Sequence, residues 1–364
     1  MPRLVAPGAL RRPAIKVLCS GQPLAGVIEG QVQNNSHYQA DTWSCSFALN
    51  APGAQTEDWW GDDARVGQVF DVQFSLDGGA TSTGFIQGEA DKIVLDDLQS
   101  TVRCEGRDLT RRFIDARTQE AFQNRTLGEI AKILAERHGM TANTSADSTL
   151  VDRFYQNDHD KITHGQFSSV RTEWDLLTAL AQHEGLDVWV SGTTLHVAPT
   201  TDPAKTEPYS ISWNPATRTG DVMALRRERS LTLAKDVVVV VRSWHSGKGR
   251  GFTRSSPQRN PHNIHAGKEQ QVVIERPNLT EDQAQKLADS TREQISRHER
   301  LISFTCPMEM SLTARSMIAL TGGMSSGWTA QPYYVNTITR RIGPGGATQE
   351  VTCKNHSPAT EVAL

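Results

Sequence analysis

The sequence lacks three features that would each assign it to a definite class of protein. No apolar run approaches the roughly 18 to 20 residues that a membrane-spanning helix requires. The N-terminal segment MPRLVAPGALRRPAIKV contains no continuous apolar region of the kind found in secretory signal peptides. The formal net charge is −3, which is too close to neutral to indicate a nucleic-acid binder or a membrane-surface protein.

Cysteine is scarce and dispersed. The 364 residues include five cysteines and no CxxC pair: Cys19, Cys45, Cys104, Cys306 and Cys353. This count and spacing support neither a zinc ribbon nor a disulfide framework. Four of the five lie in or beside alternating segments, which predicts buried, reduced thiols that pack as small apolar groups.

Signatures of catalysis are also missing. No GxSxG motif is present, and TGGMSSG (321–327) is predicted to be a loop between strands. GKGRG (247–251) has neither the spacing of a phosphate loop nor a helix start after it. Carboxylate pairing for glycoside cleavage is a spatial property and stays open, but no pair stands out. We therefore expect no catalytic or cofactor-binding residues and no enzyme activity.

One segment resembles a metal site. NDHDKITHG (157–165) offers Asp158, His159, Asp160 and His164, whose side chains are of the types that bind zinc or a harder ion. The spacing matches no HExxH or HxH helix, and His262 and His265 in NPHNIH form a weaker pair. We interpret both segments as loops and expect no bound metal.

The pattern along the chain predicts a mixed β and α+β fold. In residues 1–106, period-two alternation indicates antiparallel strands, as in DTWSCSFAL and FDVQFSLDGG. Residues 107–215 alternate helices with short strands and are predicted to form a central α/β domain. Residues 216–364 return to β character, with DVVVVVRSW as a buried strand and one surface helix inserted at 279–300.

The central region repeats one packing unit. Thr126 with Glu129, and Thr172 with Asp175, have the spacing of a capping box at the start of a helix. Each predicted helix ends at a glycine, followed by an apolar residue. The pattern predicts two matching buried stripes, with Leu134 and Leu180 at corresponding places: Ile130, Ile133 and Leu134, then Leu176, Leu177, Leu180 and Ala181.

Two segments are candidates for partner binding. Trp59 and Trp60 in EDWWGDD could stack on a sugar, but tryptophan is enriched in contact cores, which favours an interface. A basic loop follows DVVVVVRSW and includes Lys248, Arg250 and Arg254. These cations could bind nucleic-acid phosphates, and we favour docking on an acidic protein neighbour.

Several motifs occur in a characteristic order. GRDLT (106–110) follows a strand, a capped helix ends in His-Gly (138–139), and EWDLLTALAQHEG (173–185) leads into a hairpin that carries a Trp. The C-terminal part adds DVVVVVRSW, a surface helix, and strands ending in YYVNTITRRIGPGGATQEVTC. Over about residues 20–355 this order resembles the baseplate hub proteins of contractile-tailed phages. These are the late-control-D and Mu-like tail protein P group, which is related to the N-terminal part of type VI secretion spike proteins.

The resemblance implies a virion structural protein without cofactors that forms a homotrimeric ring, with two similar β-barrel-like domains flanking the central domain. Three subunits would present six quasi-equivalent barrels and so adapt a trimeric central spike to a hexameric tail tube. Expected partners are the spike, the tail tube, and baseplate wedge or tape-measure proteins, with DNA only passing through. The expected location is the tail baseplate, assembled in the host cytoplasm without membrane insertion. The alternative function is a tail-associated peptidoglycan hydrolase.

Overall fold

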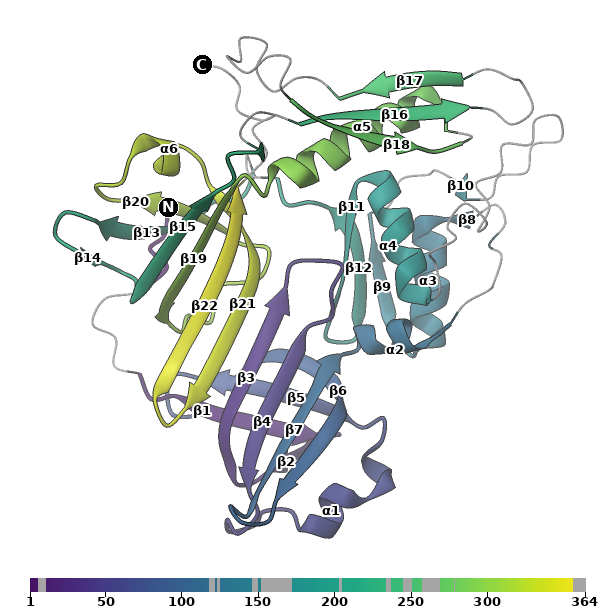
Figure 1. Cartoon of the computed structure of the whole chain (residues 1–364). Helices are drawn as coiled ribbons and strands as arrows, with labels where there is room; N and C mark the ends of the chain where they lie inside the picture. Colours follow the sequence, from purple (N-terminus) through teal and green to yellow (C-terminus); the bar gives the residue numbers. More distant parts are fainter. Residues whose placement is uncertain are drawn as a thin grey trace.

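The computed structural model describes residues 1–5, 11–117, 122, 125–145, 150–151, 172–202, 205–233, 237–244, 251–256, 269–277 and 279–355. Figure 1 shows a large β sheet, a helical unit beside it, and a small sheet with one long helix. The large sheet has 14 strands and consists of two halves that come from opposite ends of the chain. Within the described residues, no helix is both long and apolar enough to cross a membrane.

The first sheet half contains the strands of the N-terminal region in the order β2-β1-β5-β6-β7-β4-β3, with all neighbours antiparallel. The alternating apolar residues of β4 and β5 fill one core, as their pattern predicts. The short helices α1 (Glu57–Gly61) and η1 (Asp63–Arg65) lie in the β4–β5 connection. The strands are β1 (Ala14–Cys19), β2 (Gln22–Leu24), β3 (Val27–Asn35), β4 (Thr42–Ala48), β5 (Val69–Ser75), β6 (Thr83–Asp96) and β7 (Thr101–Asp108).

The second sheet half repeats this strand order as β14-β13-β20-β21-β22-β19-β15. Strands β15, β19, β20, β21 and β22 take the places of β3, β4, β5, β6 and β7. Its core is separate from that of the first half. The strands are β13 (Tyr209–Asn214), β14 (Thr219–Gly220), β15 (Ala224–Arg229), β19 (Arg300–Pro307), β20 (Met317–Thr321), β21 (Tyr333–Gly343) and β22 (Gly346–Asn355), with α6 (Ser326–Thr329) between β20 and β21.

The two halves match in detail as well as in order. The β6–β7 ladder is interrupted between Ala90 and Lys92, and the β21–β22 ladder is interrupted at the corresponding place, between Val335 and Thr337. One pairing differs, because β1 runs antiparallel to β5 whereas β13 runs parallel to β20. The five matched strands therefore share one frame with a common register. All five cysteines are buried and free, which confirms their prediction as apolar packing groups.

A seam between β21 and β3 joins the halves, and Figure 1 shows the yellow β21 beside the purple β3. Residues 337–342 of β21 pair antiparallel with residues 30–35 of β3. Residues 337–342 pair with β3 through the same edge of β21 through which Tyr333 and Tyr334 pair with β20.

The prediction of two β-barrel-like domains therefore needs correction, because none of the sheets formed by the described residues is closed. The outer edge of β3, which could have closed the first half on β1, pairs with β21 instead. The predicted boundary at residue 107 falls inside β7, and that at residue 216 falls just after β13.

The helical unit contains the predicted repeat. Both capping boxes, at Thr126 and at Thr172, are formed. Gly139 and Gly185 have φ values of +68° and +71°, the left-handed conformation that glycine adopts easily. The helices pack together with the sheet in the order β11-β12-β9. The elements are α2 (Thr110–Asp115), α3 (Leu127–Arg137), α4 (Glu173–Glu184), β8 (Arg125–Thr126), β9 (Thr141–Thr144), β10 (Leu150–Val151), β11 (Leu186–Ser191) and β12 (Thr194–Pro199).

A fourth core is formed by residues that lie between β15 and β19 in the chain. Strands β16 (Val237–Trp244), β17 (Gly251–Ser255) and β18 (Gln270–Glu275) form a sheet, and the predicted surface helix, α5 (Glu281–Ser296), covers one of its faces. Ala284, Leu287 and Ala288 of α5 share this core with Val239 and Val241 of β16. The segment DVVVVVRSW therefore belongs to this small sheet and not to the second sheet half.

Candidate functional site

The GRDLT motif forms the transition from the first sheet half to the helical unit. β7 ends at Asp108, and α2 begins at Thr110. The Asp108 carboxylate accepts hydrogen bonds from the Thr110 hydroxyl at 2.8 Å and the Thr110 backbone N–H at 3.3 Å. The backbone N–H of Asp108 donates to the carbonyl of Asp41 at 2.9 Å, which holds the β3–β4 connection in place. Burial raises the pKa of Asp108 well above its usual value.

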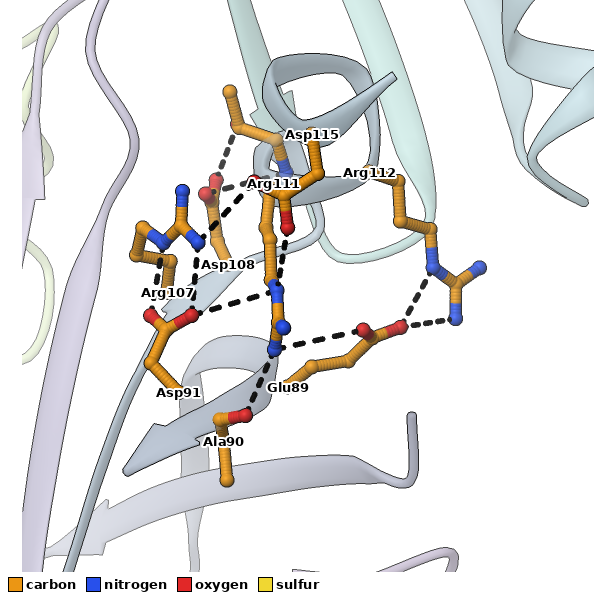
Figure 2. Close-up of polar contacts among 9 residues, drawn as sticks. Glu89, Ala90, Asp91, Arg107, Asp108, Arg111, Arg112 and Asp115 are labelled. Carbon is orange, nitrogen blue, oxygen red and sulfur yellow. Dashed lines mark hydrogen bonds and ion pairs between the residues drawn. The ribbon is translucent and has the colours of Figure 1, made fainter. Parts of the chain in front are cut away.

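Arg107 of this motif and Arg111, which follows it in α2, form ion pairs that hold the end of β7 against β6 and α2, as Figure 2 shows. Arg107 donates from Nε and Nη2 to the two oxygens of Asp91, each at 2.8 Å. Arg111 donates to Asp115 at 2.9 Å and to the carbonyl of Ala90 at 2.7 Å. The hydrogen bonds from Arg107 lower the pKa of Asp91, and the same contact raises the pKa of Arg107. Paired bonds of this kind fix geometry as well as charge.

Arg112 extends the contact into the helical unit. Its Nη2 lies 2.7 Å from Oε1 of the buried Glu89 on β6, and its Nη1 donates to the carbonyl of His138 at the end of α3 at 2.8 Å. On its other side, His138 contacts Glu173 of α4 at 2.5 Å, and Arg137 donates to Glu173 at 2.6 Å. Glu173 is 2% exposed. A continuous polar network therefore runs from β6 through α2 and α3 to α4.

A second buried polar cluster lies at the seam. Asp41 accepts from the Asn35 backbone N–H at 2.7 Å and from the Asn34 side chain at 2.8 Å, and Asn34 in turn accepts from Arg340 of β21 at 2.9 Å. Arg340 is 1% exposed and stacks on Phe85. Burial raises the pKa of Asp41 to about 6 and lowers that of Arg340 to about 10.

The seam also contacts the helical unit through Arg315. Burial lowers the pKa of Arg315 to about 10. Its guanidinium lies over the ring of Trp189 in β11, 3.1 Å from the ring centroid, and donates to the carbonyl of Ser36 at 2.5 Å. A cavity of about 290 Å³ beside the seam is lined by three carboxyl groups: Asp41, Asp71 and Asp108.

These groups are suited to holding parts of the chain together. The side chains of both networks bond mainly to one another and to backbone carbonyls of neighbouring elements. In the described part of the chain, no three or more His, Cys, Asp or Glu side chains gather in a way that could hold a metal ion. The metal-like segment with Asp158, His159, Asp160 and His164 lies outside the described residues, as do His262 and His265.

The three predicted partner-binding residues that the structure describes lie in different parts of the fold: Trp59 and Trp60 in α1, and Arg254 in β17. Trp60 is 3% exposed and packs on Phe47 in the first core, whereas Trp59 is half-buried with the Arg65 guanidinium over its ring. Arg254 lies in β17 and forms an ion pair with Glu281 of α5. Lys248 and Arg250 lie outside the described residues. Partner binding by these five residues stays a prediction.

Comparison of the whole chain with solved structures identifies its fold. The 43 kDa tail protein of prophage MuSo2 from Shewanella oneidensis is 15% identical with a TM-score of 0.68, over 96% of this chain and 99% of that protein. A tail protein from Neisseria meningitidis MC58 is 13% identical with a TM-score of 0.66, over 94% and 96%. This chain has the fold of phage tail proteins. The resemblance found in the sequence is confirmed at the level of fold.

The same fold extends to type VI secretion. A component of the E. coli type VI secretion system, described as structurally similar to the T4 tail proteins gp27 and gp5, is 12% identical with a TM-score of 0.56, over 94% of this chain and 78% of that protein. No family model and no curated protein sequence matches the chain. Low identity over the full length means that the fold is shared while most side chains differ.

Sequence reasoning missed the buried charges at the seam. Arg340 lies in YYVNTITRRIG, where alternation places it on the same face as Ile338 and Ile342. An arginine at an apolar position of this alternating pattern therefore indicated, in the sequence itself, that the side chain is buried and needs a polar partner. Asp41 and Glu173 gave no such signal, because each stands beside a helix or turn where acids are common.

Proposed function

We propose that this chain is the hub of a contractile tail, a homotrimeric ring that adapts a trimeric central spike to a hexameric tail tube. The observation that carries the proposal is the duplicated five-strand frame, with its interruption at the same place in both halves. Three copies of a chain with two matched halves present six similar surfaces around one axis. The tail-protein fold supports this structural role.

The proposed partners follow from this arrangement. The ring would bind the spike on one side and the tail tube on the other, with wedge or tape-measure proteins outside and DNA only passing through. Arg254, together with Lys248 and Arg250, is proposed to dock on an acidic neighbour, because Arg254 lies on the small sheet at the outer edge strand β17. The protein would be assembled in the host cytoplasm and reside in the virion baseplate.

The test is the mass of the purified protein by light scattering, alone and with the spike protein of the same tail. We expect three copies per particle in at least one of the two samples. A monomer at high micromolar concentration that stays monomeric with the spike protein would overturn the proposal. A turbidity assay on peptidoglycan should show no lysis, and lysis would favour the hydrolase instead.

Docking through the basic residues is tested by replacing Lys248, Arg250 and Arg254 with Ser. We expect weaker assembly with tail proteins and an unchanged trimer, and the loss relative to the unchanged protein should be largest at low salt and shrink as salt is added, because salt screens the charge contacts that the variant lacks. Normal particles that eject DNA at an altered rate would instead indicate that these cations line the DNA path.

A further inference from the structure

The matched frames differ in which strand edges are covered. In β21, residues 337–342 pair with β3 on the edge that faces away from β22. In β6, the corresponding residues 92–96 pair only with β7, because the β5 ladder stops at Glu89. β15, the counterpart of β3, pairs with β19 alone. Within the described residues, one copy therefore has two open edges that correspond to the two sides of the seam.

The registers of the two halves define which residues correspond. Aligning the interruptions in the two ladders places Lys92 at the position of Thr337 and Asp96 at that of Arg341. On the other side, Gly30 of β3 pairs with Cys45, and Leu225 of β15 pairs with Phe304 at the same place in the frame. Arg226 thus corresponds to Gln31.

We propose that β15 of one copy pairs antiparallel with residues 92–96 of β6 in a neighbouring copy, in the register that the seam uses within the chain. This inference rests on the proposed trimeric ring and names the strands that would close it. Transferring the seam register places Asp96 opposite Arg226, Val94 opposite Glu228 and Lys92 opposite Ser230 of the neighbouring copy. A contact between two different surfaces of the same chain closes a ring when its rotation permits.

The side chains at these edges complement each other. Within the chain, Arg341 donates to Gln31 across the seam at 2.6 Å and 3.1 Å. The corresponding pair between copies is Asp96 and Arg226, which carry opposite charges. Opposite charges placed directly across an antiparallel ladder stabilise the pairing. The Arg226 side chain is 79% exposed in a single copy, so it is accessible to a partner.

Exposed apolar residues flank both open edges. Met223 immediately precedes β15 and is 67% exposed, Leu231 is the second residue after β15 and is 72% exposed, and Val94 in β6 is 40% exposed. The loops that connect the strands support the same contact. Within the chain, the β19–β20 connection places Met308 and Met310 against the core of the first half. The corresponding β4–β5 connection carries Val66, which is 81% exposed in one copy. Burial of such side chains favours association.

Cysteine cross-linking tests the register. Residues opposite each other in an antiparallel ladder have Cα atoms about 4.5 to 5.5 Å apart, within the range of a disulfide. We expect D96C/R226C to form covalent oligomers of up to three chains under mild oxidation. The control K92C/R226C is four residues out of register, about 13 Å along the strand, and should not cross-link. The native cysteines are all buried and should contribute little.

Charge reversal supplies an independent readout. D96R and R226D should each reduce the trimer fraction at least several-fold, and the double variant D96R/R226D should restore it. A trimer that ignores both single changes and does not cross-link through D96C/R226C would overturn the strand pairing while leaving the proposed hub intact. A chain that stays monomeric even with the spike protein would overturn both.

Discussion

The two sheet halves have the same strand frame but different surroundings. The outer edge of β3 is covered by β21, and the β3–β4 connection is a short turn that contacts the helical unit. The outer edge of β15 is open in the described residues, and the β15–β19 connection carries a whole extra sheet and helix. The local pattern of apolar and polar residues can therefore specify the same strand frame twice, while the strand edges and connections determine what each sheet half contacts.

The largest expected effect contrasts the two cores. Phe304 and Cys45 occupy the same place in the frame, and each is 1% exposed. Phe304→Ala should lower the free energy of unfolding by about 3 to 5 kcal/mol, because it deletes a large buried side chain. Cys45→Ala should cost about 1 kcal/mol, since far fewer atoms are lost. Urea unfolding at fixed protein concentration measures both, and equal losses would show that the Phe304 ring contributes no more to its core than the Cys45 thiol does.

The next effect concerns the seam. Arg340→Met should cost about 2 to 4 kcal/mol, because it leaves the Asn34 side-chain oxygen and the Leu312 carbonyl without their donor. The counterpart of Arg340 in the first half is Leu95, which is only half-buried. Leu95→Met should cost less than about 1.5 kcal/mol, as volume-conserving exchanges do. If Arg340→Met were as mild as its control, the seam would not depend on this buried charge.

The two sheet halves also differ in their buried carboxyl groups and therefore in how their stability depends on pH. Burial raises the pKa values of Asp41 and Asp108, whereas the counterpart of Asp108 in the second half is the neutral Asn355. The charged groups that interact with Asp41 are Arg315, Arg340 and the Asp108 carboxyl. Because both folded-state pKa values are raised, the stability contribution of each carboxyl is complete below its unfolded pKa of about 4 and is lost as pH rises through its folded pKa, which is about 6 for Asp41.

Asp108→Asn should therefore flatten the fall in stability between pH 5 and 7, a slope of at most about 1.4 kcal/mol per pH unit for one proton. Denaturant midpoints at pH 5, 6 and 7 for the two proteins provide the measurement. The conservative variant Asp77→Asn is a control, because that exposed carboxyl has a lowered pKa and titrates outside this range. An unchanged slope in Asp108→Asn would mean that Asp108 does not take up a proton on folding.

The smallest expected effects on stability concern Gln31 of β3 and Arg226 of β15, which occupy the same position in the two frames. Gln31→Ala removes the acceptor for Arg341 across the seam and should cost about 0.5 to 1 kcal/mol. Arg226→Ala removes only an exposed pair with Glu228 and should change the stability of a single chain by less than about 0.5 kcal/mol. Thermal unfolding of dilute protein compares the two. A large loss for Arg226→Ala at dilution would show that it stabilises the chain internally.

Much of the local structure could be predicted from particular residues. Alternation placed Trp43 and Phe47 on the buried face of one strand, and both are buried. The capping boxes at Thr126 and Thr172 form as predicted, because the cap and its partner lie three residues apart and need no distant contact. The predicted surface helix is present as α5. Among the candidate partner residues, Trp60 is buried in the first core, and partner binding by these residues stays a prediction.

The sequence by itself determined which segments become strands and helices, where the helices begin and end, and which face of each is apolar. These properties depend on neighbours within a few residues. Only the tertiary structure decided that β3 pairs with β21, that β16 belongs to a separate sheet, and that Arg340 is buried beside Asn34. The reason is that strand edges carry the same backbone donors and acceptors everywhere, so that pairing between distant strands is selected by the packing of all faces together.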